Sequence, residues 1–95
     1  MSTSSTQPRF TDKQGQYLAF IHAYALVNGR PPAEADMERF FGVTPPSVHR
    51  MVVELEQRRL IRRLPRQARS IEVAIDPSEL PRLLRQPIRS SVERY

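Results

Sequence analysis

The sequence predicts a mainly α-helical fold in which three helices precede a small two-stranded β-hairpin and a short C-terminal helix. Apolar residues recur at helical spacing in three segments before residue 58. These segments are bounded by threonine, proline and glycine, which commonly begin or end helices. Segments with the pattern of strands appear only at residues 60–64 and 70–75. Ninety-five residues are enough for one domain of this kind.

The first helix is predicted over residues 12–28. Thr11 can cap its start, and Gln14, three residues later, completes a capping box. Gly29 suits the left-handed position that commonly follows the last residue of a helix. Two apolar stripes at helical spacing predict that the helix is covered on more than one side. The stripes are Leu18, Ile21 and Ala25, and Phe20, Tyr24 and Val27.

The second and third helices are predicted on either side of a turn of about three residues. The second helix covers residues 33–41 and ends at Gly42. The third begins at Thr44-Pro45, because threonine is a good cap and proline fits the first helical position, and it extends to about Arg58. This arrangement is a helix-turn-helix. The core-facing stripes are Ala33, Met37, Phe40 and Phe41 in the second helix, and Val48, Met51, Val52 and Leu55 in the third.

Two strands, at residues 60–64 and 70–75, are predicted to form a hairpin around a basic loop. Pro65 lacks the N–H that a strand ladder needs, so the hairpin should be short or bulged there. A two-stranded hairpin directly after a helix-turn-helix is the wing of a winged helix-turn-helix. The sequence therefore predicts that fold.

The end of the domain is predicted to be a short helix. Asp76 as a cap, Pro77 at the first position and Glu79 three residues after the cap give a helix-start pattern. The helix should reach about residue 84 and bury Leu80, Leu83 and Leu84. The domain would then span residues 10–84, with a disordered tail at residues 1–9 and a flexible basic tail at residues 85–95.

Positive charge is concentrated in the second half of the chain. Residues 1–43 carry four basic and four acidic side chains, whereas residues 44–95 carry eleven arginines and six acids, which accounts for the net charge of +5. Codon bias alone could explain the preference for arginine over lysine, but it does not explain why six of the arginines lie between residues 58 and 69. Glu54, Glu56 and Glu72 are too few to pair with all six. The cluster therefore favours nucleic-acid phosphates over a salt-bridged, solvated surface.

Other functional classes are disfavoured by the residues present. The sequence has no cysteine, no glycine-rich phosphate loop, no metal-ligand cluster and no apolar run near the 20 residues that a membrane helix needs. Nucleophilic catalysis needs a base close to a serine, threonine or cysteine, but the two histidines, His22 and His49, fall on different predicted helices and there is no cysteine. We therefore expect no enzymatic activity, no cofactor or metal, no small-molecule ligand and no membrane partner. The expected location is the cytoplasm, in association with the nucleoid.

Several short segments, in order and spacing, are shared with a known family. They are Phe10-Thr11-Asp12-Lys13-Gln14, Gly29-Arg30-Pro31-Pro32, Phe41-Gly42-Val43-Thr44-Pro45, the residues Leu55, Leu60 and Ile61, and Ala68-Arg69-Ser70-Ile71. With them, residues 10–75 resemble the N-terminal DNA-binding domain of LexA-type SOS repressors, a winged helix-turn-helix. The resemblance implies a DNA-binding regulator. The family's self-cleaving peptidase domain is expected to be absent.

The resemblance places base contacts at the start of the third helix, which is also the end that meets base edges in a helix-turn-helix. The positions are Thr44, Pro46, Ser47, His49 and Arg50. The family has asparagine at position 46, alanine at 47 and two glutamates at 49 and 50, so a different operator is expected. Arg50 could read guanine or could contact phosphate. From the basic hairpin and its flanks, the expected phosphate contacts are Arg58, Arg62, Arg63, Arg66, Gln67, Arg69 and Ser70.

The sequence thus favours sequence-specific binding of double-stranded DNA by a stand-alone LexA-like winged helix that regulates transcription, as a repressor does. A homodimer would have to form without the peptidase domain, through the helix at residues 80–84 or through the tail. Two alternatives stay open. One is a protein-interaction module, and the other is an accessory DNA-binding factor of a mobile element or phage.

Overall fold

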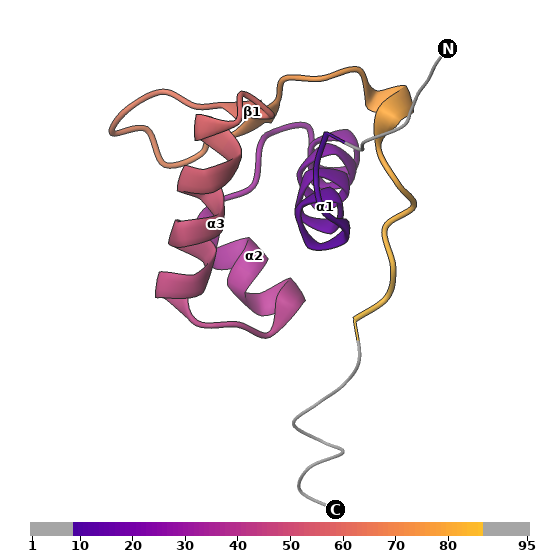
Figure 1. The fold of residues 1–95 in the computed structure, drawn as a ribbon. Helices are drawn as coiled ribbons and strands as arrows, with labels where there is room; N and C mark the ends of the chain where they lie inside the picture. Colours follow the sequence, from indigo (N-terminus) through magenta and orange to yellow (C-terminus); the bar gives the residue numbers. More distant parts are fainter. Residues whose placement is uncertain (1–8, 87–95) are drawn as a thin grey trace, which may run out of the picture.

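The computed structural model describes residues 9–86 and has the predicted winged helix-turn-helix fold (Figure 1). Of the tails expected at residues 1–9 and 85–95, residues 1–8 and 87–95 lie outside the described residues. The elements in chain order are α1 (Asp12–Asn28), α2 (Glu34–Phe41), α3 (Pro45–Gln57), β1 (Ile61–Arg62), β2 (Glu72–Val73) and the 3-10 turn η1 (Pro77–Glu79).

Helix α1 has the bounds that its capping residues predict. The Thr11 hydroxyl accepts a hydrogen bond from the Gln14 N–H, and the Gln14 side-chain oxygen accepts one from the Thr11 N–H. Gly29 ends the helix with a φ of 72°. The second apolar stripe was wrong at one position, because Val27 is 82% exposed. Val27 lies in the last turn of α1, and residues 26–30 are all exposed.

The helix-turn-helix forms as predicted, with α2 beginning one residue late. Ala33 is the N-cap of α2, and its N–H donates to the Asp36 carboxylate at 2.8 Å. Gly42, with a φ of 66°, ends α2. Helix α3 then starts at Pro45, and the Thr44 hydroxyl accepts from the Ser47 N–H at 3.4 Å.

Helix α3 ends in a Schellman motif. The Leu60 N–H donates to the Leu55 carbonyl and the Arg59 N–H to the Glu56 carbonyl, each at 2.9 Å. Arg59 occupies the left-handed position, with a φ of 62°. Glycine is the usual residue at such a position because it adopts a positive φ without steric cost. Arginine adopts this conformation less favourably, and the chain turns from α3 into the hairpin there.

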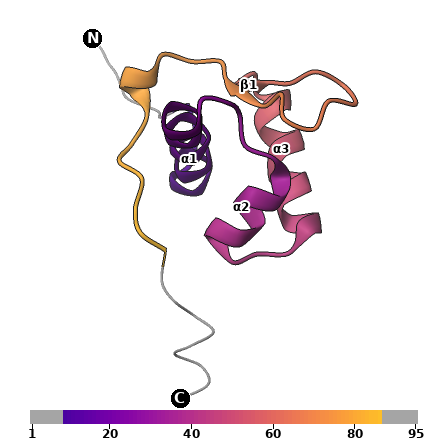
Figure 2. The same cartoon turned by 180° about the vertical axis from the view of Figure 1, so that it is seen from behind.

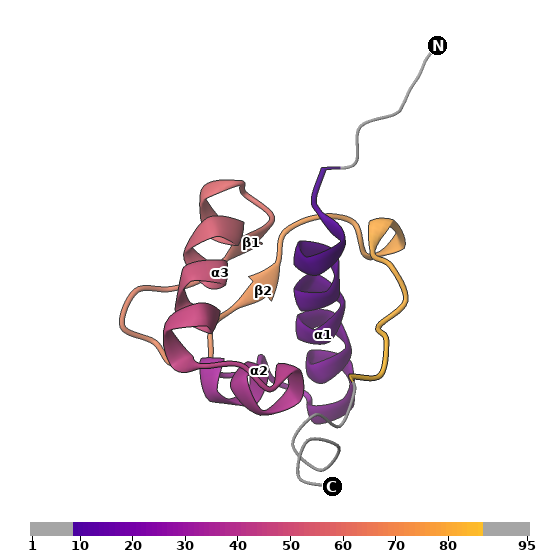
Figure 3. The ribbon, with the colours of Figure 1, turned by 60° about the horizontal axis from the view of Figure 1, so that its bottom comes forward.

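The two strands are antiparallel and shorter than the sequence suggested. Ile61 pairs with Val73 and Arg62 with Glu72. The ladder ends because the Leu64 N–H donates to the Ser70 side-chain oxygen, at 2.8 Å, instead of to a strand carbonyl. The expectation of a short hairpin near Pro65 is consistent with this geometry. The loop between the strands projects on the side of α3 that is far from α1 (Figure 3).

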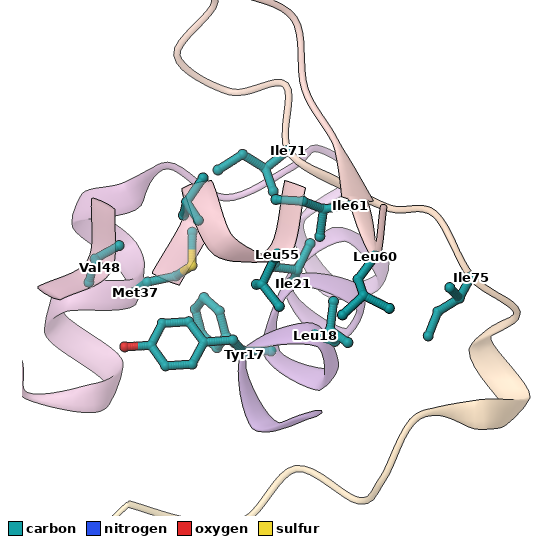
Figure 4. Packing of buried hydrophobic residues seen from close by; sticks show 12 residues of the cluster. Tyr17, Leu18, Ile21, Met37, Val48, Leu55, Leu60, Ile61, Ile71 and Ile75 are labelled. Carbon is teal, nitrogen blue, oxygen red and sulfur yellow. The ribbon is translucent and has the colours of Figure 1, made fainter. Parts of the chain in front are cut away.

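One core joins the three helices to the hairpin, as Figure 4 shows. The Tyr17 ring stacks on the Phe41 ring, with centroids 4.1 Å apart. The predicted stripe of α3 is buried at three of its four positions, and Met51 is half-buried. The buried cluster consists of Tyr17, Leu18, Phe20, Ile21, Met37, Val48, Val52, Leu55, Leu60, Ile61, Ile71 and Ile75.

The predicted C-terminal helix is wrong. Only a 3-10 turn of three residues forms, and Leu80 is extended, with a ψ of 143°. The reason is Pro81, because the residue before a proline is driven out of the α region. Leu84 is consequently exposed. Residues 80–86 instead run as an extended segment beside α1 (Figure 2).

The C-terminal segment, residues 76–86, is held on α1 by packing and by neutral hydrogen bonds. A Cβ added to Gly15 would lie 3.0 Å from both the Phe10 ring and the Pro81 ring, so a larger residue would require these rings to shift. The Gln16 side chain donates to the Arg82 carbonyl at 2.9 Å and accepts from the Leu84 N–H at 2.8 Å.

Candidate nucleic-acid interface

The five predicted base-contacting residues lie together at the start of α3. Thr44, Pro46, His49 and Arg50 are exposed, and Ser47 is half-buried. The Thr44 and Ser47 hydroxyls are hydrogen-bonded to each other at 3.0 Å. This end of α3 therefore presents hydroxyl, imidazole and guanidinium groups to solvent within two turns.

Two of these side chains differ in how they are held. His49 Nδ1 lies 3.4 Å from the Glu34 carboxylate at the start of α2. Arg50 forms no ion pair within the described residues 9–86, and it lines a shallow groove along α3 with Pro46 and His49. The Arg50 guanidinium can therefore meet a ligand without first giving up an internal partner.

The arginines of the hairpin fall into two groups. Arg58, Arg59 and Arg66 are exposed and form no ion pair within the part of the chain that the structure describes. Arg62, Arg63 and Arg69 do have acidic partners. Arg62 lies 3.5 Å from Glu72 across the hairpin.

Two of the acids that pair with Arg63 and Arg69, Glu34 and Asp36, lie in α2 and were not among the expected partners. Arg63 donates to Glu56 of α3 at 3.0 Å and lies 3.7 Å from Glu34 of α2. Arg69 pairs with Asp36 of α2 at 3.0 Å. Within the described residues, three of the six arginines are therefore paired and three are not, so the acids are too few to pair with all six, as expected. Glu34 and Asp36 were missed because they are 29 or more residues away in the sequence.

The wing loop is closed by Ser70. Its hydroxyl oxygen accepts from the Leu64 N–H and lies 3.2 Å from the Leu64 carbonyl and 3.0 Å from the Gln67 carbonyl. The exposed tip contains Arg66, with a φ of 63°, and Gln67. Ser70 thus has a structural function inside the loop, whereas Arg66 and Gln67 point their polar groups outward.

The start of α3 and the wing are connected on one surface by the Glu34 carboxylate. The same oxygen, Oε2, lies 3.4 Å from His49 and 3.7 Å from Arg63. Beside it, a groove is lined by Glu34, Glu56, Arg63, Arg66 and Gln67, between α2, α3 and the wing loop. His49 at the start of α3 and Arg63 of the wing therefore both face Glu34, so the two elements do not lie on unrelated sides of the molecule.

The electrostatics of the wing base centre on Asp36. Burial by itself would raise the pKa of Asp36, since its side chain is 8% exposed. The hydrogen bonds from the Ala33 N–H and from Arg69, with the charges of Arg69 and Arg39, outweigh burial and hold the pKa below its ordinary value. Asp36 is therefore a charged, buried group at neutral pH.

Residues 9–86 contain neither a metal centre nor a membrane-spanning helix. No group of three or more His, Cys, Asp or Glu side chains between residues 9 and 86 could hold a metal ion. Within the same residues, no helix has the length and apolar character needed to cross a membrane.

Comparison with known proteins agrees with the fold. A LexA repressor from Bartonella quintana (strain Toulouse) is 39% identical to the chain over 71 residues. Over these residues the chain is similar to a LexA repressor. The similarity covers 74% of this chain but only 30% of that repressor, so the chain spans less than a third of its relative's length. This similarity confirms the resemblance to LexA-type repressors over the 71 aligned residues. No family model matches the chain.

Proposed function

We propose that the chain binds double-stranded DNA in a sequence-specific manner and regulates transcription as a non-enzymatic, repressor-type protein of the cytoplasm and nucleoid. The observation that carries the proposal is the surface shared by the start of α3 and the basic wing, which Glu34 connects through His49 and Arg63. The relationship to a protein named as a repressor supports it.

The proposed base contacts come from the start of α3. In a helix-turn-helix, this end of the recognition helix enters the major groove. Arg50 is the strongest candidate for direct reading, because it is exposed and not engaged in an ion pair within residues 9–86. A bidentate contact with guanine would contribute about 1–3 kcal/mol of discrimination. His49 would have to leave Glu34 to reach a base.

The proposed phosphate contacts are those with outward-facing polar groups: Arg58, Arg62, Arg66 and Gln67. Arg63, Arg69 and Ser70 were also expected to contact phosphate, but each has internal partners that favour a structural function. Three arginine contacts predict that log affinity falls against log salt with a slope of about −3, from about −0.9 per phosphate.

Selection of bound sequences from a random duplex pool tests the proposal directly. A defined sequence should emerge, and its affinity measured by fluorescence anisotropy should fall with salt as above. The Arg50→Ala variant should lose preference at one base pair, whereas Arg66→Ala should weaken binding to all sequences alike. Failure to enrich any sequence, or an affinity that does not depend on salt, would contradict the proposal. Palindromic sequences among the winners would indicate a dimer.

A protein-interaction function is the second candidate, and one observation favours it. Leu26 and Val27 are 72% and 82% exposed at the end of α1, away from the α3 surface. Capture of a partner that persists after nuclease treatment, and that is lost in a Leu26→Ser, Val27→Ser variant, would support this candidate. An accessory role for a mobile element or phage would use the same DNA surface.

A further inference from the structure

The sequence predicts that Arg69 contacts phosphate, yet in the structure its guanidinium is directed into the protein. Nη1 lies 3.2 Å from the Tyr24 hydroxyl, 3.3 Å from the Pro31 carbonyl and 3.0 Å from Asp36 Oδ2. These three acceptors belong to α1, to the connector after it and to α2. One side chain from the end of the wing loop therefore contacts three separate parts of the helical scaffold.

The acceptor that carries the charge is itself fixed. Asp36 Oδ2 also accepts from the Ala33 N–H, and Oδ1 pairs with Arg39. Asp36 is 8% exposed, whereas the Arg69 side chain is 35% exposed. A buried carboxylate that is held on both oxygens cannot follow Arg69 outward, so Arg69 would have to abandon it to reach a phosphate.

We propose that Arg69 is a positioning residue that fixes the wing on the helix-turn-helix through Asp36, and so sets where the wing tip lies relative to α3. The inference rests on the proposed function, in which the tip and α3 contact the same duplex. Arg63 holds the other end of the loop, through Glu56 of α3. Between these two attachments only residues 64–68 project, and they include the exposed Arg66.

Neutralising Asp36 separates this proposal from direct phosphate contact by the sign of the effect. Removing a negative charge near a basic surface should strengthen DNA binding if charge alone matters. If Asp36 positions the wing through Arg69, the same change should weaken binding although the protein becomes more positive. Glu72 supplies the matched control, because it is an exposed acid paired with Arg62 at the same hairpin.

The experiment measures duplex affinity for wild type, Asp36→Asn, Arg69→Lys and Glu72→Gln, using the sequence selected by the wild-type chain. Asp36→Asn and Arg69→Lys should each weaken binding by about fivefold or more, the lower end of typical coupling between distinct sites. The double variant should be no weaker than the weaker single one. Glu72→Gln should bind as tightly as wild type or more tightly. Stronger binding by Asp36→Asn, or full affinity in Arg69→Lys, would overturn the proposal.

A second measurement needs no DNA. Hydrogen exchange in the free protein should rise at the wing amides, including the Leu64 N–H, in Asp36→Asn and Arg69→Lys, but not in Arg66→Ala. Exchange unchanged in all three would refute positioning. If exchange at the wing rises in these variants but the wild-type chain binds no duplex, the positioning of the wing by Arg69 stands and the proposed function is rejected. Exchange at core amides of α1 shows whether a variant has unfolded as a whole.

Discussion

The wing and the C-terminal segment are both irregular stretches that lie against the helices, and they are held by different forces. The strands of the wing join the core through Ile61 and Ile71, whereas the two ends of its loop are attached by ion pairs, from Arg63 to Glu56 and from Arg69 to Asp36. The C-terminal segment is attached by the close approach of Pro81 to Gly15 and by the neutral amide of Gln16. Salt and anionic ligands should therefore act mainly on the wing loop, whereas steric changes should act on the C-terminal segment.

The largest expected effect is a steric one on the C-terminal segment. Gly15→Leu would place a side chain where the Phe10 and Pro81 rings now lie, about 3.0 Å from the added Cβ. Overpacking of this kind costs about 1–3 kcal/mol, which should appear as a lower free energy of unfolding in urea. Hydrogen exchange at Leu84 should rise while exchange at Leu64 stays the same. Lys13→Leu, on the exposed side of α1, is the control, and an equal loss there would contradict the steric explanation.

The next effect is acid destabilisation of the wing. The pKa of Asp36 is lower in the folded protein than in the unfolded chain, where it is about 3.9. Its stabilising contribution is therefore complete above about pH 4 and is lost as pH falls toward the lower, folded value. Thermal unfolding followed by circular dichroism between about pH 5 and pH 2 should show a smaller decline in Asp36→Asn than in wild type.

The C-terminal segment has its own acid-sensitive group, which sharpens the comparison. The Ser78 N–H donates to Asp76 and lowers the pKa of that carboxyl, so its contribution is also lost below about pH 4. Asp76→Asn should reduce the acid sensitivity of exchange at the C-terminal segment but not at the wing. Equal effects of Asp36→Asn and Asp76→Asn on the wing amides would remove the distinction between the two regions.

Salt should affect the two regions unequally, by a smaller amount. Raising the ionic strength from about 0.1 M to about 1 M shortens the Debye length from about 10 Å to about 3 Å. Because Arg63 and Arg69 remain partly exposed, their ion pairs should weaken and exchange at Leu64 should increase. Exchange at Leu84, whose N–H donates to neutral Gln16, should not follow.

The smallest effect is expected for the ion pair that the C-terminal segment forms with Arg9. Arg9 lies 3.0 Å from Glu79, and the two side chains are 58% and 38% exposed. Exposed pairs contribute less than about 1 kcal/mol, so Arg9→Ala should lower the free energy of unfolding by no more than that. A larger loss would mean that this pair, and not the packing at Gly15, holds the segment in place.

The sequence predicted the helices well because their signals are local. Thr11, Gln14 and Gly29 fixed the two ends of α1, and Thr44-Pro45 fixed the start of α3. The C-terminal helix was wrong because Pro81 outweighs the helix-start pattern at Asp76 and drives Leu80 out of the α region.

The candidate site was less accessible to sequence reasoning than the fold. The crowding of charge showed that residues 58–69 form a basic segment, but it could not separate free arginines from paired ones. That separation depends on Asp36 and Glu34, which reach the wing only after α2 has packed beside it. Glu34 and Asp36 lie in the first turn of α2, where the helix dipole by itself favours acidic residues, so nothing local in the sequence signals their contacts with the wing.

The exit from α3 has a practical consequence for redesign. The direction in which the hairpin departs is set by the backbone of Arg59, which adopts the left-handed conformation without being glycine. A β-branched residue at position 59 would resist that conformation and would change the orientation of the hairpin relative to α3. A design that grafts this hairpin onto another helix pair should therefore also keep the left-handed backbone conformation at position 59.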